Sequence, residues 1–459
     1  MHLGIKSLLM IHSITIGVLL TIMWRLLARR GLFNWRSAGF WAWLAFGLYF
    51  TLNPLFSVLD GYTMKYEIRL SIAGGTQRAL WILLVNIVGI VVFYVAYFRT
   101  KPKTFFWRLN SEDQNISPPM MLIMIIFILY AGYSLLIFRA GIYSIVRERI
   151  IENGIFIGDV SGYENSGYVF LFVPVILLIL SSKRIPHLLG LLMGIAYIVL
   201  SLPDKWSRYA TISMLLAIII ANTVRRSSSR PRLFFMGIVL LFAITLQLRG
   251  HIPWTLSLNG SELMALFSEI PNNLGGVLGS IDASMLSVWY LQSYVVDTIT
   301  GYDFGIPIVN YLLTGWIPTM IFPQKYFMID WLKSIQPDID SSIIIDLYYG
   351  GKSTLFGSFY TSGGIFGVGV FSWLAGILSR KLDGMLAEDS PNLIKAIGIS
   401  WMSVLWLGWA SSARWNILII GALFLPGLAL WIVAPKITSV EIRLFQFDQN
   451  VHDLKLNKK

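Results

Sequence analysis

The chain has 459 residues, of which 56% are hydrophobic and 13% charged, and its mean hydropathy is +0.68. This excess of apolar side chains excludes an ordinary soluble domain and indicates a polytopic membrane protein. The net charge of +12 is scattered between apolar segments, which argues against nucleic-acid binding, and the lack of cysteine excludes disulfides, thiolate nucleophiles and zinc–thiolate sites.

Eleven apolar segments come close to the length of about 20 residues that a membrane-spanning helix needs. They predict an all-α polytopic integral membrane protein of about 11 transmembrane helices (10–12), forming a single membrane domain over residues 1–459. No cleavage site follows the first segment, so we expect that segment to be retained. The predicted spans are Ser7–Trp24, Gly39–Leu59, Ala79–Phe98, Met120–Phe138, Tyr168–Leu180, Leu188–Leu202, Thr211–Val224, Leu233–Leu248, Ser362–Leu378, Ile394–Ser411 and Ile417–Val433.

Arginine and lysine are dense in alternate loops, namely those after the first, third, fifth, seventh and ninth spans, and in the tail over residues 434–459. Positive charge marks cytoplasmic loops, so we expect the tail to lie inside and the N-terminus outside. Two large loops then face outside, over residues 139–167 and 249–361. Within the second, Gly305–Pro323 is apolar but broken by Pro307, Gly315 and Pro318, and we expect a re-entrant or interfacial element; a full span there would reverse the C-terminal topology.

Several cations lie at the outer ends of the predicted spans, against the general charge bias. Guanidinium groups bind phosphate oxygens in pairs, so this set favours recognition of a lipid-linked diphosphate at the outer membrane surface. The alternative is that each side chain reaches lipid phosphates or pairs with a nearby acidic residue such as Glu148, Glu152, Asp159 or Asp204. The cations are Arg139, Arg147, Arg149, Lys205, Arg208 and Arg249.

These residues give the chain a resemblance to the Wzy-type O-antigen or oligosaccharide repeat-unit polymerases. That family has two large outside loops, each with an arginine followed ten residues later by a glycine, a spacing matched by Arg147–Gly158 and Arg249–Gly260. The stretch from Tyr311 to Lys325 is similar to a proline-containing motif of the family, although Thr319 replaces the usual arginine. Residues 356–367 resemble the glycine-rich entry to the next span.

The resemblance implies a C-type glycosyltransferase-like fold and a metal-independent, cofactor-free membrane enzyme. Such a polymerase acts on the periplasmic face of the bacterial inner membrane, where it transfers a growing glycan from undecaprenyl diphosphate to the next lipid-linked repeat unit. A polysaccharide chain-length regulator is a partner that the resemblance implies, together with the lipid-linked glycan and membrane lipid.

Glycan transfer requires cations that stabilise the leaving diphosphate and a base that orients and deprotonates the acceptor hydroxyl. For the first role we expect Arg147, Arg249 and Arg208, supported by Arg139 and Arg149. The base remains open between two residues: His251 can titrate near neutral pH, and Asp282 lies among apolar residues. Asp297 and Asp303 are further candidates.

Other patterns carry weaker hypotheses. The glycines at positions 363, 364, 367 and 369 predict close helix packing in the ninth span. Trp254, Trp289 and Trp316 are candidates for stacking on sugars, although most aromatic residues fit the interfacial belt of a membrane protein. Two alternative functions remain. A flippase or other transporter would require ionisable residues within the spans and internal repeats, and an O-antigen ligase would differ mainly in its acceptor.

Overall fold

The computed structural model describes residues 4–34, 36–59, 63, 67–68, 70–71, 73–102, 117–139, 167–201, 208–226, 284–304, 354–387, 390–408 and 426–433. Every regular element in these ranges is helical, as the sequence predicts. Four of the described helices are long and apolar enough to cross a membrane, which supports an α-helical membrane protein. They are Ile5–Arg29 (α1), the continuous helix Ala38–Leu59, Gly75–Arg99 (α5) and Gly364–Met385 (α19).

The remaining predicted spans are matched only in part. The described chain has shorter apolar helices at four of them, and a further helix at the tenth. The eighth predicted span, Leu233–Leu248, and the segment Gly305–Pro323 lie outside the described residues. The elements at these spans are α6 (Pro118–Arg139), the 3-10 helix η2 (Gly167–Leu171), α9 (Phe172–Leu180), α10 (Arg184–Ser201), α11 (Arg208–Arg226) and α20 (Asn392–Gly408).

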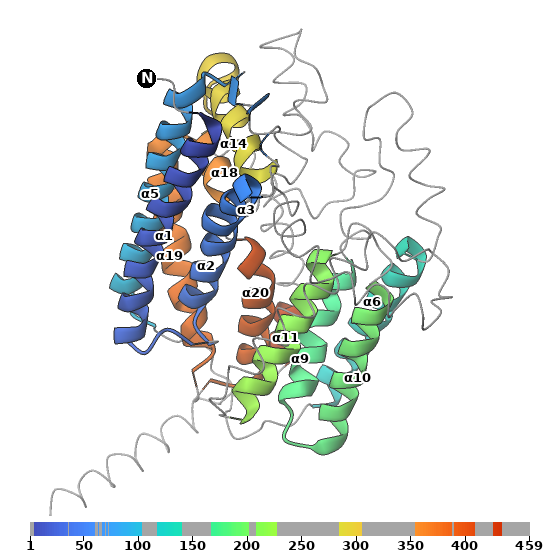
Figure 1. Ribbon diagram of the computed structural model, residues 1–459. Coiled ribbons are helices and arrows are strands. Elements are labelled where there is room, and N and C mark those ends of the chain that lie inside the picture. The colour runs from blue at the N-terminus through green and yellow to red at the C-terminus, as the bar shows by residue number, and fades with distance from the viewer. Residues whose placement is uncertain are drawn as a thin grey trace, which may run out of the picture.

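The helices form two groups that lie side by side (Figure 1). One group contains α1, α5, α19 and the helix Ala38–Leu59, and the other contains α6, α9, α10 and α11. Helix α20 lies between them and packs against α9 and α11 on one side and α19 and α2 (Ala38–Phe46) on the other. At the upper end of the first group in Figure 1 are α14 (Ser284–Val295), the π-helix η3 (Val296–Thr300) and α18 (Leu355–Thr361).

The second spanning helix changes its hydrogen-bond register midway. It consists of α2, the π-helix η1 (Gly47–Leu52) and α3 (Asn53–Leu59). Pro54 has no backbone N–H, so the Phe50 carbonyl four residues earlier loses its α-helical partner. A π-turn next to a proline is a common way for a helix to absorb such a defect. Proline therefore accounts for the irregular turn in the middle of this span.

Helices α5 and α19 pack closely along their length, and a glycine sets their separation. A Cβ atom on Gly376 would lie 2.9 Å from the Ala96 Cβ and would also collide with the Phe93 carbonyl. The prediction of close helix packing at four other glycines is confirmed at Gly367, where a Cβ would lie 2.4 Å from the Phe359 carbonyl of α18. It is wrong at Gly369, which has open space around it.

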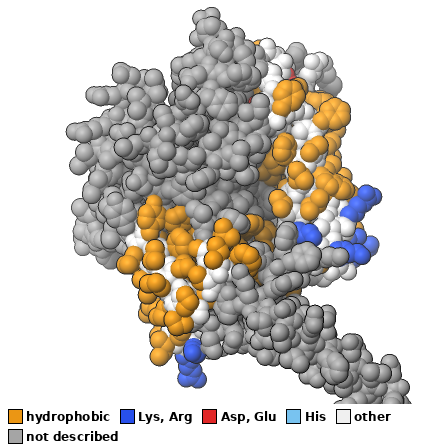
Figure 2. Space-filling view, turned by 180° about the vertical axis from the view of Figure 1, so that it is seen from behind, with side chains coloured by type: hydrophobic (Ala, Val, Ile, Leu, Met, Phe, Trp, Pro, Cys, Tyr) orange, Lys and Arg blue, Asp and Glu red, His pale blue; other side chains and the backbone are white. Residues whose placement is uncertain are grey.

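Apolar side chains cover the outside of the bundle, as expected for a surface that faces lipid. On α1, three side chains one helical turn apart are at least half exposed: Ile14, Val18 and Ile22. Figure 2 shows hydrophobic side chains over the described surface, with Lys and Arg gathered at the lower ends of the helices.

Hydrogen bonds show that the basic ends of several helices lie together. The Arg30 side chain donates to the Phe98 carbonyl, and the Arg36 side chain reaches the Thr223 carbonyl near the end of α11. Asn392, at the start of α20, donates to the Leu180 carbonyl at the end of α9. We call this the Asp383 end, after the carboxylate described below, and the opposite end the Asp297 end. The described basic residues after the first, third, fifth, seventh and ninth predicted spans lie at the Asp383 end.

Candidate functional site

A polar cluster joins three elements at the Asp297 end of the bundle. Arg78, in the first turn of α5, forms an ion pair with Asp297 of η3. The Tyr360 hydroxyl of α18 lies 3.0 and 2.9 Å from the two carboxylate oxygens of Asp297, and the Tyr302 hydroxyl donates to Oδ1 at 3.1 Å. Trp81 donates its indole N–H to the Tyr360 hydroxyl at 2.9 Å. We call these five residues the Asp297 cluster.

The local backbone explains how Asp297 reaches this position. The π-turn of η3 ends at Gly301, whose φ of +68° is readily adopted only by glycine. The chain then turns so that the Asp303 N–H donates to the Thr361 carbonyl at 2.8 Å. Gly364, with a φ of +60°, leaves room for the Tyr302 hydroxyl, which would lie 2.9 Å from a Cβ there. The segment 301–304 is therefore held against the junction of α18 and α19.

The charges of the Asp297 cluster are only partly buried. The side chains of Arg78 and Asp297 keep 16% and 22% of their accessible surface, so solvent weakens their ion pair. Burial raises the pKa of the Tyr360 phenol; the hydrogen bond from Trp81 opposes that shift and the negative charge of Asp297 adds to it. Burial and the same carboxylate also raise the pKa of the Tyr302 phenol. Both phenols therefore stay neutral and act as hydrogen-bond donors at physiological pH.

Aromatic rings with partly solvent-exposed surfaces lie near this charged pair. Trp81 is 36% exposed, Tyr302 39% and Phe304 79%. Phe304 also has a φ of +51°, a left-handed conformation that is rare for a bulky side chain and that often marks a functional segment. The described part of the chain thus combines, at one end of the bundle, a guanidinium, a carboxylate, two phenols and accessible ring surfaces.

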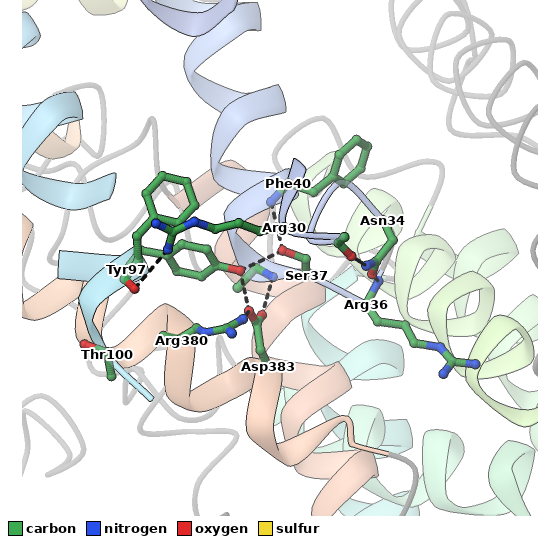
Figure 3. Close-up of polar contacts among 12 residues, drawn as sticks. Arg30, Asn34, Arg36, Ser37, Phe40, Tyr97, Thr100, Arg380 and Asp383 are labelled. Carbon is green, nitrogen blue, oxygen red and sulfur yellow. Dashed lines mark hydrogen bonds and ion pairs between the residues drawn. The ribbon is translucent and has the colours of Figure 1, made fainter. Parts of the chain in front are cut away.

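A second polar cluster, at the Asp383 end, is better explained by stability. The Asp383 carboxylate accepts hydrogen bonds from the Ala38 N–H at 2.7 Å, from Arg380 at 3.0 Å and from the Tyr97 hydroxyl (Figure 3). Ser37 lies 2.8 Å from the same hydroxyl and caps α2 through the Phe40 N–H. A carboxylate at the first N–H groups of a helix is favourable because of the helix dipole. This cluster ties α2, α5 and α19 together.

The Asp383 cluster also corrects a predicted boundary. The sequence places Arg380 and Lys381 in a loop after Leu378, whereas α19 continues to Met385. The charge of Arg380 is accommodated inside the helix by Asp383 and by the Tyr97 ring, whose centroid lies 5.4 Å from the guanidinium carbon.

A third polar contact lies within the spanning helices. The His12 ring of α1 is buried, and its Nε2 lies 3.1 Å from the Asn86 amide nitrogen of α5. Because that amide nitrogen only donates, Nε2 is the acceptor in this arrangement and the ring proton sits on Nδ1. The ring also lies beside the backbone of Phe50, whose carbonyl cannot bond to Pro54 because proline has no N–H. His12 lies in the first predicted span, but no sequence pattern singled it out.

The structure describes few of the predicted site residues. Arg139 is the last residue of α6 and Arg208 the first residue of α11, and the Arg36–Thr223 contact at the far end of α11 places the start of that helix toward the Asp297 end. The other predicted residues lie outside the described ranges: Arg147, Arg149, Arg249, His251 and Asp282.

Two lesser candidates are described and have clear environments. Asp297 has its carboxylate committed to Arg78 and two phenols, an arrangement that supports a structural role rather than that of a base. Asp303 is 2% exposed. Trp289 is completely buried, so the hypothesis that it stacks on sugars is wrong; Trp254 and Trp316 lie outside the described residues.

Sequence reasoning missed Arg78, Trp81 and Tyr360 as members of a site. Arg78 did carry a usable signal, because it lies at the predicted outer end of the third span, where a cation opposes the charge bias as Arg139 and Arg208 do. Trp81 and Tyr360 look like ordinary interfacial aromatics. Their contact joins residues 279 positions apart, which no local pattern reveals.

Comparisons of the chain with known protein-family models, with curated proteins and with solved structures found no match. In the part of the chain that the structure describes, no group of three or more His, Cys, Asp or Glu side chains could hold a metal ion.

Proposed function

We propose that this chain is a membrane glycosyltransferase of the Wzy type, which joins undecaprenyl-diphosphate-linked oligosaccharide units into a surface polysaccharide such as O-antigen. The proposal orients the Asp383 end toward the cytoplasm and the Asp297 end toward the periplasmic face of a bacterial inner membrane, because the basic helix ends gather at the former. The reaction then takes place at the Asp297 end.

The observation that carries the proposal is the placement of cations at that end. Arg78 begins α5, and Arg208 begins α11 at the end remote from Thr223. Both lie away from the Asp383 end, where most described basic residues gather. The positive-inside bias does not account for cations at the opposite end. A polymerase needs cations at this level of the membrane, because its leaving group is a diphosphate.

The proposed chemistry follows from the residue types. The bond between the anomeric carbon of the donor glycan and its diphosphate breaks, and the acceptor hydroxyl oxygen forms a new bond to that carbon. Arginines stabilise the departing diphosphate, with Arg147, Arg208 and Arg249 in the main role and Arg139 and Arg149 in support. The hydroxyl proton passes to a base, for which His251 and Asp282 are the candidates.

Within this proposal the Asp297 cluster acts as a fixed framework. Arg78 is largely neutralised by Asp297 and is therefore a poorer diphosphate ligand than an unpaired arginine. Its ion pair and the two phenols hold η3, α5 and α18 in one arrangement. They would set the position from which the second large loop extends.

The proposal is tested by the surface glycan of cells that lack this chain, displayed as a ladder on a gel. A single capped repeat without a ladder supports polymerisation, whereas uncapped long polymer on the carrier lipid points to a ligase. An unchanged profile contradicts both. In complemented cells, Arg147→Ala and Arg249→Ala should each abolish the ladder while membrane insertion persists, and Arg249→Lys should restore little because lysine cannot bind phosphate in a bidentate manner.

Transport of a lipid-linked glycan is the second candidate, and the His12–Asn86 contact is the observation that favours it. An ionisable side chain buried within the spans is a feature of transporters. If the chain is a flippase, its loss should trap lipid-linked repeat units on the cytoplasmic face. Accumulation of the repeat units on the outer face would instead argue for the polymerase.

A further inference from the structure

The exposed rings at the Asp297 end are held in place by their own polar groups. Trp81 is anchored through its indole N–H to Tyr360, and Tyr302 is anchored through its hydroxyl to Asp297. The Tyr302 and Tyr360 rings meet edge to face, with centroids 6.2 Å apart. Rings fixed in this way lose little conformational entropy when a ligand covers them.

A guanidinium with spare bonding capacity lies beside these rings. Arg78 uses Nη1 for Asp297 and Nε for the Ala73 carbonyl at 3.4 Å, and its Nη2 bonds to no group in the described part of the chain. The pair is partly open to solvent, so a ligand can reach the guanidinium. Because Asp297 balances Arg78, the site has little net charge and suits a neutral ligand.

Phe304 adds a third ring, and its backbone is strained. Its left-handed φ of +51° coincides with a side chain that is 79% exposed, so burial of the ring against the described chain does not compensate for the strain. Strain of this kind is usually retained where a segment has a function. The Asp303–Thr361 hydrogen bond fixes the residue immediately before it.

We propose that Trp81, Tyr302 and Phe304, together with Arg78 and Asp297, form a binding site for a neutral sugar ring of the lipid-linked glycan. A sugar presents an apolar C–H face, which matches the ring surfaces, and a rim of hydroxyl groups, which can accept hydrogen bonds from the guanidinium. The inference rests on the proposed function for the identity of the glycan, and it assigns these residues to sugar binding and not to the transfer step.

Binding is measured with the oligosaccharide repeat unit released from its carrier lipid by mild acid, using saturation-transfer NMR on the full chain in nanodiscs. Trp81→Ala and Tyr302→Ala should each raise the Kd by about threefold to tenfold, the range expected for loss of one aromatic contact. Trp373→Ala is the matched control, because Trp373 is 37% exposed on the spanning helix α19, and it should bind as the wild type does.

Phe304→Ala is a variant that should not disturb folding, because the Phe304 side chain forms no hydrogen bond. It should also bind the repeat unit several-fold more weakly. Wild-type affinity in all three ring variants, or no binding to the wild type, overturns the inference and leaves the rings as an interfacial belt. The glycan ladder of cells that lack the chain distinguishes the two proposals. If that ladder is intact while the purified chain still binds the repeat unit through the rings, the polymerase proposal is refuted and the sugar site is retained.

Discussion

Replacement of Asp383 by alanine should destabilise the chain far more than replacement of Asp297. Asp383 and Arg380 keep only 8% and 17% of their side-chain surface. Loss of one partner from such a pair leaves a charge without compensation, which costs about 3–5 kcal/mol. The Ala38 N–H would also lose its acceptor. Asp297 is more exposed than Asp383, with 22% of its side-chain surface accessible, and no described backbone N–H loses an acceptor with it. Its loss should therefore cost only about 1 kcal/mol.

Thermal unfolding of the detergent-purified chain, followed by tryptophan fluorescence at one scan rate, measures this difference. Asp383→Ala should lower the Tm clearly, Asp383→Asn should lower it less because the amide oxygen can still accept from Ala38, and Asp297→Ala should lower it least. Equal Tm values for the two alanine variants would refute the assignment of Asp383 as the main structural clamp.

Three further predictions concern packing and buried polar groups. Gly376→Leu should destabilise the α5–α19 contact by about 1–3 kcal/mol, measured by the same unfolding assay, whereas Gly369→Ala should have little effect because the space around Gly369 is open. His12→Ala should cost about 1–3 kcal/mol by leaving Asn86 unpaired, and adding Asn86→Leu should recover part of that loss; no recovery would contradict the pairing. Tyr302→Phe should keep the ring but loosen it, so the Kd for the released repeat unit should rise less than in Tyr302→Ala.

The spanning helices were predictable because their signal is local. About 20 apolar residues and a basic flank define such a helix, and this rule located α1, α5 and the helix Ala38–Leu59 to within a few residues. It ended α19 too early, because it took Arg380 as the first residue of a loop. Asp383 and the Tyr97 ring accommodate Arg380 within the helix, and Tyr97 lies 283 residues earlier in the chain, beyond the reach of a local rule.

The candidate site was less predictable for the same reason. Asp297 was noted as an acidic residue in a large loop, but its environment depends on Arg78 and Tyr360, which come from two other helices. The glycine pattern of the ninth span included Gly369 and omitted Gly376, because glycine spacing does not say which helix face meets a neighbour. Gly376 faces α5, and Gly369 does not.

The most direct test of the proposed function is reconstitution. The purified chain in nanodiscs is supplied with lipid-linked repeat units extracted from cells that lack it, and the products are separated by size. The proposal predicts a ladder of lipid-linked glycans with release of undecaprenyl diphosphate, lost in Arg249→Ala and retained in Trp373→Ala. Repeat units that remain single after incubation with folded wild-type chain would contradict it.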